Sequence, residues 1–286
     1  MEQKEDSLIG VDLGGTKVAA GKVHGGEIAK QLTEKLDPSS EDPMDAVGII
    51  RKLIRQLMDR EVRGIGVGVP GLVDRTTGVV YDVLNIANWK EIPLRAILEE
   101  EFQVPVYIDN DSNCFAMGEY RYGAYAGHPD FVGITLGTGM GAGIVKNGSL
   151  IPDAHCCSGE FGTMSYLDGI YEHYTGSFFF SRTYGKSGEE MAAAAGRGDP
   201  EALKAFELYG EHLGNSIKTI VMAVDPPLVI IGGSLSRAHP FYEEAMWGSI
   251  RKIPFQSVLE NFQVRFTDTK DIAILGAAAL CPDAAK

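Results

Sequence analysis

Apolar residues recur at helical spacing in several parts of the chain. The strongest case is the stretch 43–60, where one helical face carries Ala46, Ile49, Ile50, Leu53, Ile54 and Leu57. A long helix is predicted over 200–224, and it should end at Asp225-Pro226-Pro227 because proline cannot continue a helix. The same spacing predicts shorter helices over 93–102, 112–122, 241–251 and 271–280.

Short apolar runs lie between these helices and predict strands over 63–69, 104–109, 228–233 and 262–266. Two further segments, which begin near residues 8 and 131, have the pattern strand, glycine turn, strand. Strands therefore alternate with helices along most of the chain. This alternation predicts an α/β fold.

The two glycine hairpins resemble each other. The stretch 8-LIGVDLGGT-16 aligns without a gap with 131-FVGITLGTG-139, and after one deletion 20–28 aligns with 142–150. A second tight turn follows each hairpin, at Gly25-Gly26 and at Asn147-Gly148. The offset is too long for a solenoid repeat and suits two domains that begin with the same hairpin. The alternative is chance similarity between two glycine-rich hairpins.

Composition narrows the class of protein. The chain has 286 residues and a net charge of −13, which argues against sequence-independent binding to nucleic acid or to anionic lipid. Its four cysteines show no CxxC spacing and no disulfide framework. No apolar run approaches membrane-spanning length, and the first residues lack the apolar core of a signal peptide. These features predict a soluble, cytoplasmic protein with reduced thiols.

Three glycine-rich stretches could hold phosphate groups: 10-GVDLGGTK-17, 135-TLGTGMGAG-143 and 231-IGGSLS-236. Glycine lets backbone N–H groups approach an anion closely, and an aspartate at the strand end, such as Asp12, can hold Mg²⁺ directly or through water. The alternatives are a plain hairpin turn for the first two stretches and a helix start that needs space for the third. A fourth stretch, Gly66 to Gly71, fits GxGxxG, but a turn follows it instead of a helix, so we reject a dinucleotide site there.

The stretch 107-YIDNDSNC-114 places polar residues at the carboxyl end of an apolar strand, where α/β proteins bind ligands. Asp111 could accept a proton from a hydroxyl group, and Asn110 could position that hydroxyl. The alternative is that Asp111 or Ser112 caps the next helix.

A possible metal site occurs in 154-AHCCSGEFGTMSYLDGIYEHYTGS-177, which contains His155, Cys156 and Cys157. Consecutive residues in an extended segment point to opposite faces, so these three cannot readily bind one ion. Structural zinc needs four nitrogen or sulfur ligands in a tetrahedral array. We therefore do not expect zinc.

Together these motifs resemble those of the ROK family of sugar kinases, within the actin/hexokinase/Hsp70 superfamily. The resembling segments, in order, are DLGGTK, GVGVPGLVD with 85-NIANW-89, IDNDSN, LGTGMGAG, SGEFG and IIGGSLS. The resemblance covers nearly the whole chain and implies a two-domain, ribonuclease H-like α/β fold with a cleft between duplicated domains. It implies a small domain of residues 1–111 with the terminal helix of about 272–286, and a larger domain of residues 112–271.

The resemblance also implies roles for individual residues. Asp111 would be the general base, and Asp12 would hold Mg²⁺, through water. The sugar would contact Gly71, Asn85, Asn110, Glu160, Thr163 and Glu172. ATP would contact Asp12, Gly14, Gly15, Thr16, Thr138, Gly139, Gly232 and Gly233.

The chain departs from the family pattern in one segment. The family commonly has a histidine after the GE-x-G segment and then a cysteine cluster that binds zinc. Here Thr163 occupies the histidine position, and no cysteine occurs between Cys157 and Cys281. The aromatic run Phe178–Phe180 could pack this loop in place of metal, although we favour ordinary core packing for it. We expect the change to Thr163 to affect sugar selectivity more than reaction class.

The resemblance implies an ATP- and Mg²⁺-dependent hexose 6-kinase, most simply a glucokinase. Other candidate substrates are N-acetylmannosamine, N-acetylglucosamine, mannose and fructose. A repressor would need an N-terminal helix-turn-helix, for which the first strand leaves no room. A non-catalytic sugar or nucleotide sensor is the alternative from another class. The expected partners are the sugar, ATP and a second copy of the chain, with no nucleic acid or membrane.

Overall fold

The computed structural model describes residues 6–37, 40–81, 83, 86 and 89–282. The chain forms two compact units, which are described separately below. Unit 1 contains residues 1–129, 148–158 and 269–286, and unit 2 contains residues 130–147 and 159–268. The predicted boundary after residue 111 falls inside unit 1. The predicted division of the chain into domains stays a prediction.

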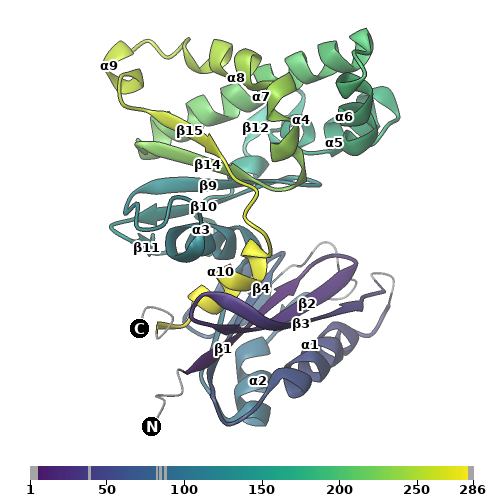
Figure 1. The fold of residues 1–286 in the computed structure, drawn as a ribbon, viewed down its shortest axis with the longest axis vertical. Helices are drawn as coiled ribbons and strands as arrows, with labels where there is room; N and C mark the ends of the chain where they lie inside the picture. Colours follow the sequence, from purple (N-terminus) through teal and green to yellow (C-terminus); the bar gives the residue numbers. More distant parts are fainter. Residues whose placement is uncertain (1–5, 38–39, 82, 84–85, 87–88, 283–286) are drawn as a thin grey trace. The chain divides into compact units, whose positions relative to one another are not determined.

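Unit 1 is built on a five-stranded sheet of order β3-β2-β1-β4-β8. Figure 1 labels its strands β1, β2, β3 and β4 and the helices α1 and α2. Its strands are β1 (Ser7–Leu13), β2 (Lys17–His24), β3 (Glu27–Lys35), β4 (Val62–Val69) and β8 (Val106–Asn110). Its helices are α1 (Met44–Leu57), α2 (Leu94–Phe102), α3 (Asp111–Tyr122) and α10 (Ile272–Ala279). A small antiparallel sheet consists of β5 (Leu72–Asp74), β6 (Val79–Tyr81) and β7 (Glu91–Ile92).

Helices cover both faces of the unit 1 sheet. The larger core lies under α1 and α2, where the apolar face of α1 buries Ile50, Leu53 and Ile54 against the strands. The other face contacts α10, which comes from the carboxyl end of the chain. A Cβ atom on Gly66 of β4 would lie only 1.7 Å from the carbonyl oxygen of Ala277. The absence of that Cβ lets α10 lie directly on the sheet.

Unit 2 contains the second five-stranded sheet, of order β11-β10-β9-β14-β15. Its strands are β9 (Phe131–Leu136), β10 (Met140–Lys146), β14 (Leu228–Gly232) and β15 (Gln263–Phe266), with edge strand β11 (Ser149–Leu150) in the segment grouped with unit 1. A two-stranded sheet joins β12 (Ser165–Tyr166) and β13 (Gly169–Ile170). The helices are η1 (Phe161–Thr163), α4 (Glu172–Thr175), α5 (Phe178–Tyr184), α6 (Gly188–Gly196), α7 (Pro200–Val224), η2 (Ser234–Phe241), α8 (Glu243–Ile250) and α9 (Gln256–Leu259).

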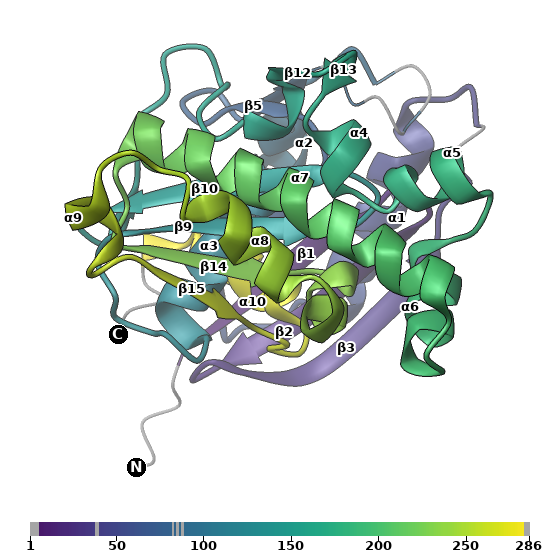
Figure 2. The same cartoon turned by 90° about the horizontal axis from the view of Figure 1, so that it is seen from above.

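Helix α7 occupies the range predicted from sequence, because its ends are chemically marked. The Asp199 side chain accepts a hydrogen bond from Ala202 N at 2.9 Å, and Pro200 fills the first helical position. The helix ends where Asp225 adopts a left-handed conformation before Pro226. Figure 2 shows α7 and α8 lying side by side over strands β9, β10, β14 and β15.

The two main sheets repeat one topology. In each, an antiparallel hairpin (β1-β2 or β9-β10) is followed by two parallel strands on its other side (β4 and β8, or β14 and β15). This correspondence confirms the internal repeat predicted from the two glycine hairpins. The fold is α/β, as predicted. No helix within the described ranges is long and apolar enough to cross a membrane.

Candidate active site

The glycine turn after β1 carries the first predicted phosphate-binding residues. Gly14 N donates to Lys17 O at 2.9 Å and closes the turn. The N–H groups of Gly15 and Thr16 make no hydrogen bond with any residue that the structure describes, and both residues are partly or fully accessible. Free N–H groups in an accessible glycine turn are suited to bind phosphate oxygens.

Asp12 and Asp111 lie close together at one edge of the unit 1 sheet. Asp12 in β1 pairs with Gly68 in β4, and a Cβ on Gly68 would lie 3.7 Å from the Cα of Asp111. Burial and the charge of Asp111 raise the pKa of Asp12 from 3.8 to about 6, and Lys17 opposes that shift. Burial also raises the pKa of Asp111, although hydrogen bonds from Ser112 oppose the increase. Two partly buried carboxylates at this edge, accessible enough to meet a ligand, can hold a cation and accept a proton.

Asn110 caps the helix that carries Asp111. Its Oδ1 accepts from Ser112 N at 2.8 Å, and its Nδ2 donates to Gly71 O at 3.2 Å. The capping residue is therefore Asn110 itself, rather than Asp111 or Ser112, which formed the structural alternative from sequence. One Nδ2 hydrogen and one Oδ1 lone pair remain for a ligand. The hydrogen bond from Nδ2 joins Asn110 to Gly71, so two of the predicted sugar-binding residues lie together.

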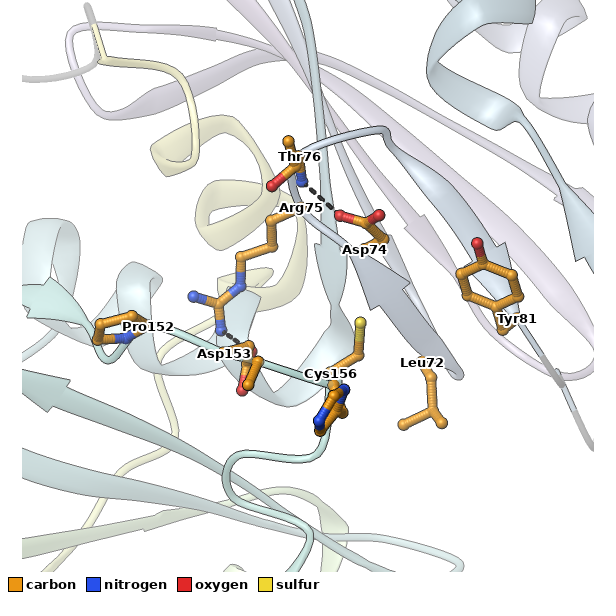
Figure 3. A pocket seen from close by; sticks show the side chains of 10 residues that line it. Leu72, Asp74, Arg75, Thr76, Tyr81, Pro152, Asp153 and Cys156 are labelled. Atoms are coloured by element: carbon orange, nitrogen blue, oxygen red, sulfur yellow. Dashed lines mark hydrogen bonds and ion pairs between the residues drawn. The ribbon is translucent and has the colours of Figure 1, made fainter.

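An ion-pair network that includes Asp109, two residues before Asp111, was not predicted from sequence. Arg75, in the turn between β5 and β6, lies with its Nε 2.9 Å from Asp109 Oδ2 and with its Nη2 2.7 Å from Asp153 Oδ2. Arg75 Nη1 also donates to Ile151 O at 2.9 Å. Figure 3 shows the Arg75 guanidinium directed at Asp153. It also shows the hydrogen bond that Asp74 accepts from the backbone N–H of Thr76. Arg75 therefore fixes residues 151–153 to strand β8.

Asp109 is the buried end of this network, and only 5% of its side chain is exposed. Its Oδ1 accepts from Asn110 N at 2.8 Å and from Asn113 Nδ2 at 2.7 Å. Burial raises the pKa of Asp109, and Arg75 and these hydrogen bonds oppose the increase. Asp109 thus holds Asn110, at the end of β8, and Asn113, in α3. These two residues lie on either side of Asp111 in the chain.

Replacement of Arg75 by methionine is expected to lower the free energy of unfolding by about 2–4 kcal/mol at pH 7, because Asp109 then stays buried without its cation. The double variant Arg75→Met/Asp109→Asn should recover part of this loss, because Asp109, the more deeply buried of the two partners of Arg75, no longer carries a charge, although Asp153 still lacks its cation. Urea unfolding of the wild type, the two single variants and the double variant measures the coupling. A double variant no more stable than Arg75→Met would contradict this account.

A pocket of about 830 Å³ adjoins this network within unit 1. On one side it is lined by Leu72, Asp74, Arg75, Thr76 and Tyr81, and on the other by residues 152–156 (Figure 3). Leu72 follows Gly71, so the pocket begins beside a predicted sugar-binding residue. Asn85, which is also predicted to contact the sugar, lies outside the described residues. Polar side chains on both walls can accept a hydroxylated ligand.

The glycine turn of unit 2 carries Thr138 and Gly139, in the position equivalent to the first turn. Gly137 N donates to Gly139 O at 3.1 Å, while the N–H groups of Thr138 and Gly139 donate to no other residue in the described ranges. A Cβ on Gly139 would lie 2.5 Å from Glu172 Oε2. The predicted phosphate turn and the predicted sugar ligand Glu172 are therefore in contact within unit 2.

Glu160 and Thr163 lie at the two ends of the short helix η1. Thr163 Oγ1 donates to Glu160 O at 2.8 Å, so its hydroxyl hydrogen is already used in a local turn. Thr163 is exposed and Glu160 is partly buried. Gly232 and Gly233 end strand β14, and Gly233 has φ of 90°. A Cβ on Gly233 would lie 2.3 Å from Leu136 O, so a larger residue would not fit there.

His155, Cys156 and Cys157 precede this segment and belong to unit 1. Cys157 Sγ contacts its neighbour His155 only through the His155 carbonyl oxygen, at 3.2 Å. Within the ranges that the structure describes, no three His, Cys, Asp or Glu side chains are arranged to hold a metal ion. The expectation that the protein lacks zinc stays a prediction.

Aromatic residues hold the segment where the sequence departs from the family pattern. The Tyr166 ring stacks on Tyr171 with centroids 4.3 Å apart, and Tyr166 Oη lies 3.1 Å from His212 Nδ1 on α7. Tyr171 Oη lies 2.7 Å from Thr219 Oγ1, also on α7. These contacts fix the residue directly before Glu172. Of the run Phe178–Phe180, the second and third residues are buried in ordinary core, as we favoured from sequence.

The predicted site residues thus form two groups. Unit 1 brings together Asp12, Gly14, Gly15, Thr16, Gly71, Asn110 and Asp111, and unit 2 carries Thr138, Gly139, Glu160, Thr163, Glu172, Gly232 and Gly233. Sequence reasoning missed Arg75, which it assigned only to a turn. It also gave no role to Asp109, although this residue lies inside the IDNDSN motif.

Comparison with known proteins identifies relatives over nearly the full chain. Residues 8–284 match the model of the ROK family. A glucokinase of Thermotoga maritima is 28% identical over 317 aligned positions, which cover 96% of each chain. An N-acetyl-D-glucosamine kinase of Shigella boydii is 34% identical over 79% of this chain and 84% of its own length.

The crystal structure of a ROK family glucokinase from Streptomyces griseus, in complex with glucose and AMPPNP, has a TM-score of 0.82 and 28% identity. The match covers 97% of this chain and 99% of that chain. This similarity confirms the predicted actin/hexokinase-like α/β fold.

Proposed function

The chain belongs to the ROK family, and from that premise we propose that it is a sugar kinase that transfers phosphate from ATP to the 6-hydroxyl of a hexose. Glucose is the substrate that we expect first, with support from the glucokinases among its relatives. N-acetylglucosamine is the second candidate, since the N-acetyl-D-glucosamine kinase of Shigella boydii has the higher identity to this chain. N-acetylmannosamine, mannose and fructose follow.

The observation that carries the proposal is the pair of partly buried carboxylates, Asp12 and Asp111, whose pKa values are raised, beside an accessible glycine turn. A carboxylate whose pKa is raised accepts a proton more readily than one in water. Asp111 would accept the proton of the 6-hydroxyl and orient its oxygen toward the phosphorus. Phosphoryl transfer has a loose transition state, so orientation of the nucleophile is the main contribution of the base.

ATP would supply the phosphoryl group, and Mg²⁺ would neutralise the negative charge on the phosphate oxygens. Asp12 would hold the Mg²⁺, through water, and its fit rests on its position at the strand end beside Gly14. The free N–H groups of Gly15 and Thr16, and those of Thr138 and Gly139, would donate to phosphate oxygens. Gly232 and Gly233 would leave room for the adenosine.

Sugar hydroxyls would be bound by Asn110, Glu160 and Glu172. Gly71 and Asn85 are the other sugar contacts that we propose. A carboxylate can accept two hydroxyl protons, which suits a polyol. Thr163 contributes only an acceptor, because its own proton goes to Glu160 O. For that reason the Thr163 segment is where we expect sugar preference to differ from that of relatives. We further propose a homodimer that binds neither nucleic acid nor membranes.

A coupled assay of ADP release across a panel of hexoses and N-acetylhexosamines tests the proposal. We expect release with glucose or N-acetylglucosamine, and the product should carry phosphate at the 6-position. If no sugar on the panel supports ADP release above the ATPase background, the kinase proposal fails. A sugar or nucleotide sensor would then be favoured, provided that calorimetry still detects binding of either ligand.

Replacement of Asp12 by asparagine should stabilise the metal-free protein while it lowers activity. The folded pKa of Asp12 is about 6 and its reference value is 3.8, so the folded protein retains a proton in this interval that the unfolded chain has lost. Ionisation therefore costs stability as pH rises through that window. At pH 7 the variant should gain about 1–3 kcal/mol of unfolding free energy, and near pH 4 it should gain almost none.

Urea unfolding from pH 4 to 8 in magnesium-free buffer measures this difference. Addition of Mg²⁺ should stabilise the wild type more than Asp12→Asn, because the variant lacks the carboxylate. A variant less stable than wild type at pH 7 without metal would contradict the electrostatic assignment.

A further inference from the structure

A second pocket in unit 1 contains an unusual concentration of positive charge. It has a volume of about 240 Å³ and is bounded by β8, α3, the start of β11 and residues 279–282. Its charged residues are Arg75, Arg95, Arg121 and Asp109. Asp109 and Asp153 both pair with Arg75, so the three arginines and these two aspartates leave a local excess of one positive charge, in a chain whose net charge is −13.

The three arginines differ in how far their hydrogen-bonding capacity is used. Arg75 is paired with Asp109 and Asp153. Arg95 donates through its two terminal nitrogens to Thr76 O and Arg75 O, at 2.7 and 2.8 Å, and its Nε is buried with no acceptor among the described residues.

Arg121 has no hydrogen bond or ion pair with any residue that the structure describes. Its guanidinium carbon lies 5.3 Å from the centroid of the Tyr120 ring, and its Nε is buried without an acceptor. A buried guanidinium N–H without an acceptor costs free energy that an anionic ligand can recover. Arg121 is therefore the residue in this pocket that most needs a partner.

The excess of positive charge favours a phosphate monoester, which carries about 1.5–2 negative charges at pH 7, over a singly charged carboxylate. A guanidinium presents a planar fork of donors that matches two oxygens of a phosphate group. Ser149 adds a hydroxyl at the rim, and Met117 and Leu150 supply apolar wall. A volume of about 240 Å³ is several times the roughly 30 Å³ that one water occupies in the liquid. It therefore has room for a phosphate group with a short carbon skeleton.

We propose that this pocket is a binding site for a small phosphate monoester, separate from the residues assigned to phosphoryl transfer. The site goes beyond the proposed function, because no catalytic step uses Arg121 or Arg95. Two of its walls, β8 and α3, are the elements that meet at Asp111. A ligand there would contact both of these elements at once.

Titration calorimetry with inorganic phosphate, at ionic strength balanced with chloride, tests the site without any need for kinase activity. We expect saturable binding to the wild type, and binding at least about tenfold weaker to Arg121→Gln, because one charge-assisted hydrogen-bonding group is lost. Arg60→Gln is the matched control, since it removes the same charge from an exposed position of unit 1 outside the pocket. Its affinity should equal that of the wild type.

Hydrogen exchange then locates the bound phosphate. Protection is expected in residues 106–122 and 148–150, whereas phosphate bound at the predicted ATP site would protect residues 14–17 and 137–139. Arg121→Lys keeps the charge but loses the planar fork of donors, so it should bind phosphate with intermediate affinity. It replaces Arg121→Gln in the test if that variant does not fold. Glucose 6-phosphate should compete with inorganic phosphate, and acetate should not.

The proposal is overturned if phosphate does not saturate the wild type, if both Arg121 variants bind as the wild type does, or if only the two glycine turns are protected. It is also overturned if acetate competes as well as glucose 6-phosphate. Failure of the kinase assay with retained phosphate binding would reject the proposed function and leave this site standing.

Discussion

Asp111→Asn is expected to lower kcat by about 10²–10⁴-fold, which is the usual contribution of a general base. Asparagine keeps the size of the side chain and can still accept a hydrogen bond from Ser112. It cannot accept the hydroxyl proton at neutral pH. Because a carboxylate of raised pKa is removed, the variant should be at least as stable as the wild type.

Steady-state kinetics with the preferred sugar, combined with calorimetry of sugar and nucleotide binding, measures this effect. Binding should change little compared with the loss in kcat. Asp59→Asn, which removes an exposed carboxylate paired with Lys22, is the matched control and should keep the wild-type rate. Full activity of Asp111→Asn would show that Asp111 is not the base.

Gly66→Ala is expected to cost about 3–5 kcal/mol of unfolding free energy or to prevent folding of unit 1. The added Cβ would lie 1.7 Å from the carbonyl oxygen of Ala277, which belongs to the backbone of α10 and cannot rotate away. Either the helix moves off the sheet or the strand distorts, and both outcomes disrupt a close-packed core. Thermal and urea unfolding measure the loss.

Gly48→Ala provides a control of the same chemistry in the same unit. A Cβ on Gly48 would have no neighbour within 4 Å, and the residue lies inside α1. Alanine there should stabilise the protein by about 0.5–1 kcal/mol through helix propensity. Equal effects of the two substitutions would refute the packing explanation for Gly66.

The role of Gly66 also explains why its GxGxxG pattern misleads. After Gly71 the chain enters strand β5, so no helix starts there to receive a pyrophosphate. The rejection of a dinucleotide site from sequence agrees with this geometry. The glycine is required by the approach of a helix backbone, which the local sequence does not reveal because Ala277 is more than 200 residues away.

Elements with strong local signals were predictable. Helix α7 has a capping aspartate, a proline at its start and prolines after its end, and its predicted and observed ranges agree. The two hairpins have nearly identical sequences, so their common topology could be predicted as well. Strand β3 could not be bounded by apolar alternation, because most of its side chains are exposed.

Helices α4, α5 and α6 were not predicted, since they are short and α6 both begins and ends with glycine. The same holds for η2, in which Pro240 interrupts regular hydrogen bonding.

The candidate site could be predicted only where it follows motifs. Asp12, Asp111 and the glycine turns lie at strand ends, which sequence patterns identify. Arg75 lies in an ordinary turn and acts through Asp109 and Asp153, which are remote from it in sequence. Ion pairs between distant segments leave no periodic pattern, so only the folded chain reveals them.

Unit 1 cannot complete its folding during synthesis until α10 has left the ribosome. Gly10 and Gly66 shape a surface for a helix that is synthesised more than 200 residues after β4. At a synthesis rate of about 5–20 residues per second, α10 is made roughly 10–40 s after β4. During this time the apolar side chains of Leu8, Ala19 and Val23 have no α10 to cover them. Newly made chains should therefore depend on chaperones until the last helix emerges, and slower synthesis would lengthen that dependence.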